Sequence, residues 1–151
     1  MPAALVVGLG HPDRGDDAVG PLVAATLRDG AVGVLEVRTS LDPLRLPDLW
    51  AGRGLVVVVD AAAGAGPAGT VRVHDASSVP LPVLPASPGS THGLSLPDVV
   101  ELSRRTGRLP PRLLVVSVAG SSFVLGEPPS PAGAAAVPAA AAAVLEVVSG
   151  G

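Results

Sequence analysis

Two aspartates and one histidine occupy positions from which their side chains could act together on one substrate or ion. Asp17 lies in the glycine-rich turn "GLGHPDRGDD", Asp60 ends the apolar run "GLVVVVD", and His92 lies in "GSTHGLSLPD" just ahead of a helix-type pattern. Two carboxylates and one imidazole suit a hard or borderline metal ion and leave a coordination position open. We therefore predict that Asp17, Asp60 and His92 are metal ligands and catalytic groups.

Each of the three residues also has an ordinary structural explanation. Asp17 precedes a helix-type pattern, where aspartate is a common N-cap. Asp60 follows an apolar run, where aspartate often forms a turn. A single loop histidine such as His92 is commonly a surface residue. Their expected meeting at one edge of one sheet favours the functional interpretation.

The elements that would position these residues follow from the apolar patterning. Val-rich runs at 4–9, 54–60 and 112–118 are typical of strands buried on both faces of a parallel sheet. Residues 32–38 predict a further strand, and the alternating segment 69–75 predicts a half-exposed edge strand that runs antiparallel. Apolar residues at three- and four-residue spacing predict a helix after the first strand. A short helix is expected within 41–50.

Two further helices complete the pattern. Ser95 and Asp98 form a capping-box sequence that opens a helix through Arg105. A last helix is expected from about Pro131 to Val148, and Pro138 should start or kink it.

These elements predict an α/β fold with helices on both faces of a mostly parallel, twisted sheet of about five strands. We expect one three-layer domain over residues 1–151. Ligands of such sheets bind outside the carboxyl ends of the strands. Asp17 and Asp60 therefore converge if their strands are neighbours. We interpret His74, in the edge strand, as an exposed polar residue, and expect Asp13 and Arg14 to pair or to face solvent.

Composition excludes several classes of function. The net charge is −3 and the ten basic residues, all arginine, are scattered, so a nucleic-acid partner is not expected. The absence of cysteine excludes disulfides, thiolate metal sites and thiol proteases. The first residues do not resemble a signal peptide, and the apolar run 128–145 is alanine-rich and interrupted by prolines. We expect a cytoplasmic protein that makes no membrane contact.

The acidic turn also carries a family resemblance. "VVGLGHPDRGDDAVGPLVA" resembles the G-x-G-N-x-x-x-x-D-[DE]-x-x-G signature of the hydrogenase maturation endopeptidases. The segments "VVVVDAAAG", "STHGLSLPDVV" and "VAGSSFVLGEPPSP" resemble later parts of that family, in order. His11 replaces the usual asparagine. It either keeps a polar contact within the turn or adds a nitrogen as a fourth metal ligand.

The resemblance implies an endopeptidase that recognises nickel in the immature large subunit of a nickel-iron hydrogenase and removes its C-terminal extension. Asp17, Asp60 and His92 would bind the nickel, which is read from the substrate, with other divalent metals as surrogates. Hydrolysis could be metal-assisted or use carboxyls that share a proton, as in aspartic proteases. The sequence leaves both open.

Two other functions are considered. A metallochaperone that binds nickel without cleavage would use the same ligands. "VVGLGHP" also resembles the opening of the peptidyl-tRNA hydrolases, but "GDDAVG" occupies the place of their catalytic histidine. Serine catalysis is not expected, because no G-x-S-x-G elbow occurs.

Overall fold

The protein has a five-stranded sheet in the order β2-β1-β3-β5-β4. A computed structural model describes residues 3–30, 35–82 and 94–150. The strands are β1 (Ala4–Leu9), β2 (Leu35–Ser40), β3 (Leu55–Ala63), β4 (Val71–Asp75) and β5 (Arg112–Gly120). All neighbours pair in parallel except β4 and β5. The predicted α/β class, including the antiparallel edge strand, is confirmed.

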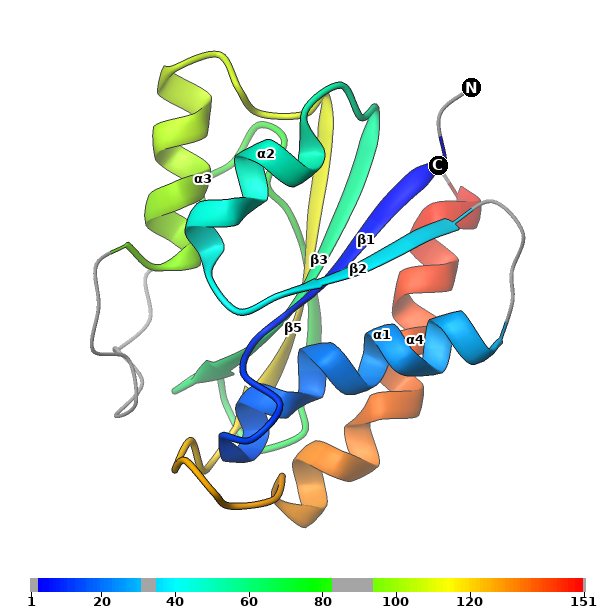
Figure 1. Ribbon diagram of the computed structural model, residues 1–151, viewed down its shortest axis with the longest axis vertical. Coiled ribbons are helices and arrows are strands. Elements are labelled where there is room, and N and C mark those ends of the chain that lie inside the picture. Colours follow the sequence, from blue (N-terminus) through cyan, green and yellow to red (C-terminus); the bar gives the residue numbers. More distant parts are fainter. Residues whose placement is uncertain (1–2, 31–34, 83–93, 151) are drawn as a thin grey trace.

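Helices cover both faces of the sheet (Figure 1). One face packs against α1 (Val19–Asp29) and α4 (Pro131–Gly150), and the other against α2 (Leu46–Trp50) and α3 (Leu96–Arg105). Two single 3₁₀ turns, η1 (Gly15–Ala18) and η2 (Pro43–Arg45), precede α1 and α2. Because both faces are covered, the middle of the central strand, Val56–Val59, is fully buried.

The helix predictions are mostly confirmed. Ser95 and Asp98 form the expected capping box at the start of α3, which ends at Arg105 as predicted. The helix α4 begins at Pro131 and contains Pro138 in its interior, so the alternative in which Pro138 starts the helix is wrong. The second strand begins at Leu35, and residues 32–34 of the predicted range 32–38 lie outside the described residues.

The helix α4 is long and apolar enough, by length and composition alone, to cross a membrane. Here its residues Ala136, Ala140 and Val144 are buried against the sheet and α1. The small side chains of Ala136 and Ala140 let this face of the helix lie close to its neighbours.

Two glycines bring the start of α1 into direct contact with the sheet. A Cβ added to Gly8 in β1 would overlap the carbonyl oxygen of Gly20 in α1. A Cβ added to Gly20 would overlap the carbonyl oxygen of Leu9 and lie 2.8 Å from that of Val59. The acidic turn before α1 is therefore held beside the carboxyl ends of β1 and β3.

We expect Gly20→Ala to lower the free energy of unfolding by about 2 kcal/mol or more. The added methyl group would press on backbone carbonyls that cannot rotate away, which outweighs the gain in helix propensity of about 1 kcal/mol. Urea denaturation measures the change. Gly54→Ala is the matched control, because a Cβ there meets no atom within 4 Å. Equal stability of the two variants would contradict the close contact.

Candidate functional site

Asp17 lies in η1, between β1 and α1, and its carboxylate points back toward the turn. Its Oδ2 accepts a hydrogen bond of 2.8 Å from the backbone N–H of His11. The N-cap of α1 is Ala18, and no side chain caps that helix. The capping interpretation of Asp17 is therefore wrong, and the carboxylate is available for another role.

Asp60 lies within β3, which continues to Ala63, so the interpretation of Asp60 as a turn former is also wrong. Its register partner in β5 is Ser117. Side chains alternate along a strand, so Asp60 lies on the same face as Val56 and Val58, which pack with α2 and α3. This position, near the carboxyl ends of the parallel strands, is where ligands bind in such sheets.

The two carboxyl groups influence each other electrostatically. Part of Asp60 reaches the surface. Desolvation of its carboxyl group and, second, the charge of Asp17 together raise the Asp60 pKa to about 8, against a backbone hydrogen bond from Ala61. Burial also raises the pKa of Asp17, against the backbone hydrogen bond from His11 and the charge of Arg14. The structure thus brings Asp17 and Asp60 together as a pair that favours a shared proton or a bound cation.

His11 makes a contact within the turn. Its Nδ1 accepts a hydrogen bond of 3.0 Å from the backbone N–H of Asp13. A neutral imidazole that accepts at Nδ1 carries its proton on Nε2, which then has no lone pair for a metal. Of the two roles considered for His11, this geometry favours the polar turn contact.

The third predicted ligand, His92, lies outside the described residues. In the segments 3–30, 35–82 and 94–150, no group of three histidine, cysteine, aspartate or glutamate side chains could hold a metal ion. The described chain therefore supplies the pair Asp17 and Asp60, and the role of His92 stays a prediction.

Asp16, the neighbour of Asp17, has a structural role that the sequence analysis missed. Its fully buried carboxylate accepts hydrogen bonds from the backbone N–H groups of Ser121 (2.8 Å) and Ser130 (2.7 Å) and from the Ser130 hydroxyl (2.9 Å). Burial alone would raise the pKa of Asp16, but hydrogen bonds from Ser121, Ser130 and Ser122 outweigh it and lower the pKa. Asp16 therefore ties the β5–α4 connection to the acidic turn.

The geometry of the turn separates the two aspartates. Adjacent residues of a 3₁₀ turn point about 120° apart, so Asp16 and Asp17 cannot face the same site. A Cβ on Gly133 in α4 would overlap the Asp16 carboxylate, which explains the glycine in the first turn of that helix.

His74 differs from its prediction as an exposed polar residue. It is partly buried, and its Nε2 lies 3.3 Å from the hydroxyl oxygen of Ser117. Asp13 is exposed, in keeping with the expectation that it faces solvent.

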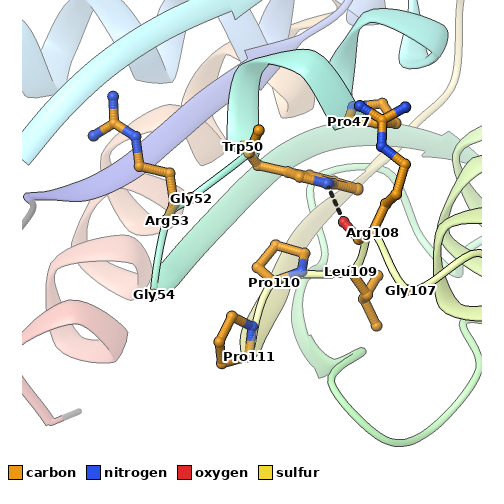
Figure 2. A pocket seen from close by; sticks show the side chains of 11 residues that line it. Pro47, Trp50, Gly52, Arg53, Gly54, Gly107, Arg108, Leu109, Pro110 and Pro111 are labelled. Atoms are coloured by element: carbon orange, nitrogen blue, oxygen red, sulfur yellow. Dashed lines mark hydrogen bonds between the residues drawn. The ribbon is translucent and has the colours of Figure 1, made fainter.

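A cavity of about 540 Å³ lies at the amino ends of the parallel strands, where β3 and β5 begin. Figure 2 shows the Trp50 indole across it, with Nε1 donating a 2.9 Å hydrogen bond to the carbonyl oxygen of Arg108. Its remaining lining comes from prolines, glycines, two arginines, Ala51 and Leu109 and holds no carboxylate. The cavity is thus separate from the pair Asp17 and Asp60.

The overall structure is similar to solved structures of hydrogenase maturation proteases. The hydrogenase maturating endopeptidase HybD from Escherichia coli has a TM-score of 0.72 and 24% identity over 97% of this chain and 91% of its own. The [NiFe] hydrogenase maturation protease HycI from Thermococcus kodakarensis has a TM-score of 0.71 and 24% identity over 98% of this chain and 93% of its own. An endopeptidase from Escherichia coli has a TM-score of 0.75 and 22% identity over 95% of this chain and 90% of its own. No protein-family model and no curated protein matches the sequence.

We expect Asp16→Asn to lower the free energy of unfolding by about 2–4 kcal/mol. The amide would aim an NH₂ group at backbone N–H donors and would leave at least one buried donor unpaired. Asp13→Asn is the matched control, because Asp13 is exposed in the same turn. Chemical denaturation of both variants measures the difference. A loss no larger than that of the control would contradict the anchoring role of Asp16.

The raised pKa of Asp60 predicts a pH dependence of stability. With an unfolded-state pKa of about 4, the folded protein holds the extra proton between about pH 4 and pH 8. The Asp60 contribution to the unfolding free energy therefore falls as the pH rises through this window and levels off above it. Asp60→Asn lacks this contribution, so its Tm relative to the unsubstituted protein should increase from pH 5 to pH 8. Thermal denaturation with chelator present checks this, and a constant difference would contradict it.

Proposed function

We propose that this chain, which has the fold of the hydrogenase maturation endopeptidases, is a peptidase of that family. It removes the C-terminal extension of a nickel-iron hydrogenase large-subunit precursor after nickel has been inserted. The observation that supports this proposal is the coupled pair Asp17 and Asp60 at the carboxyl edge of the sheet. A cytoplasmic location fits this activity.

The pair can perform the proton transfers of peptide hydrolysis. An attacking water must lose a proton, and the leaving amine must gain one. Asp60, with a pKa of about 8, holds a proton at neutral pH and can donate it to the leaving nitrogen. Asp17, when ionised, can accept the proton of the water as its oxygen bonds to the carbonyl carbon. Two carboxyls with different proton affinities thus supply an acid and a base.

The same pair suits a divalent cation. A cation between Asp17 and Asp60 would replace the shared proton and remove the repulsion between two carboxylates. Nickel carried by the substrate would be held by Asp17, Asp60 and, as the sequence predicts, His92, and would act as a Lewis acid toward the peptide carbonyl. Other divalent metals would serve as surrogates. Three ligands without sulfur form an incomplete shell, so affinity in the free protein should be weak.

We expect Asp60→Asn to slow precursor cleavage by at least about 100-fold with the fold retained, because an amide neither donates the catalytic proton nor balances a cation. The assay incubates the protein with a nickel-iron hydrogenase large-subunit precursor, with and without nickel loaded. Intact mass then reports the loss of a C-terminal peptide. Asp48→Asn is the matched control, since its 86% exposed side chain pairs with Arg108 beside the cavity at the opposite edge.

Three outcomes would count against the proposal. Equal processing by Asp60→Asn would remove Asp60 from the chemistry. Cleavage that does not depend on nickel in the precursor would remove nickel recognition. A tightly held, stoichiometric nickel without any cleavage would favour the metallochaperone, which uses the same ligands.

A further inference from the structure

Polar side chains continue from Asp60 across two more strands. Ser117 in β5 is the register partner of Asp60 in β3, and His74 in β4 pairs in register with Val115. Register partners point to the same face of a sheet, and Val115 packs with the cluster beneath α2 and α3. Asp60, Ser117 and His74 therefore share that face with Arg72, the register partner of Ser117 in β4, while the other residues of these strands on that face are apolar.

Ser117 and His74 are bonded to each other and still have capacity to bind another group. The distance between Ser117 Oγ and His74 Nε2 is 3.3 Å, and Ser117 is only 7% exposed. Among the described residues, neither side chain makes another hydrogen bond. If the hydroxyl donates to Nε2, the imidazole keeps an N–H donor and the hydroxyl keeps an acceptor. If Nε2 donates, the roles reverse, and one donor and one acceptor again stay unused.

One donor beside one acceptor is complementary to a peptide group, which offers a carbonyl oxygen and an N–H. We propose that Ser117 and His74 form a subsite that binds a peptide group of the substrate, next to the pair Asp17 and Asp60. The inference rests on the proposed function, because it takes the scissile bond to lie at that pair.

The spacing of the strands defines which part of the substrate this subsite contacts. The strands β3 and β4 flank β5, and His74 pairs with Val115, two residues before the Asp60 partner Ser117. Asp60 and His74 therefore lie two strand spacings across and two residues along the strands, or about 12 Å, apart. An extended polypeptide advances about 3.3 Å per residue. His74 therefore contacts the substrate about three to four residues from the scissile bond, on the side of the edge strand.

Steady-state kinetics of precursor cleavage test the subsite. A contact made equally in the bound and transition states changes KM rather than kcat. We expect His74→Ala to raise KM about tenfold and to change kcat less than about threefold, as for one lost hydrogen-bonded contact. His74→Gln retains a donor and an acceptor and should keep KM within about threefold of the unsubstituted protein.

Val73→Ala is the matched control, because Val73 is 46% exposed on the other face of the same strand. The subsite is overturned if the unsubstituted protein cleaves and His74→Ala leaves KM unchanged, or if His74→Gln and Val73→Ala raise KM as much as His74→Ala does. A lower Tm of His74→Ala without a change in KM would assign His74 a structural role only and would also overturn the subsite. If the unsubstituted protein cleaves no precursor, the proposed function fails and the subsite fails with it.

Discussion

The close contact between Gly8 and Gly20 is the constraint on which the acidic site depends. Backbone meets backbone there, since a Cβ on either residue would overlap a carbonyl oxygen of the other segment. This contact seats the first turn of α1 against β1 and β3. The 3₁₀ turn that carries Asp17 is consequently placed next to Asp60, within range of its charge.

Glycine-rich turns between a strand and a helix often bind phosphate through backbone N–H groups. In this turn the N–H of His11 is already bonded to the Asp17 carboxylate. Asp16 likewise takes up the N–H groups of Ser121 and Ser130. An anion would meet two carboxyl groups and few free donors, so this edge of the sheet suits a proton or a cation instead.

Asp16 and Asp17 show how hydrogen-bond donors decide the behaviour of a buried carboxyl group. Both are adjacent in sequence and both are affected by desolvation. Asp16 receives several donors and its pKa falls, so it is a stable anion that anchors the β5–α4 connection. Asp17 receives one backbone donor and its pKa rises, so its proton affinity can respond to Asp60 or to a cation.

The sequence by itself determined the α/β class, the antiparallel edge strand and the positions of Asp17 and Asp60, because strand burial and glycine-rich turns leave local patterns. Tertiary structure alone decided that Asp16 is an anchor and that His74 joins Ser117. Their partners lie 43 or more residues away in the chain, at Ser117 for His74 and at Ser121 and Ser130 for Asp16. Such contacts are set by the order of strands and their register, which no local pattern encodes.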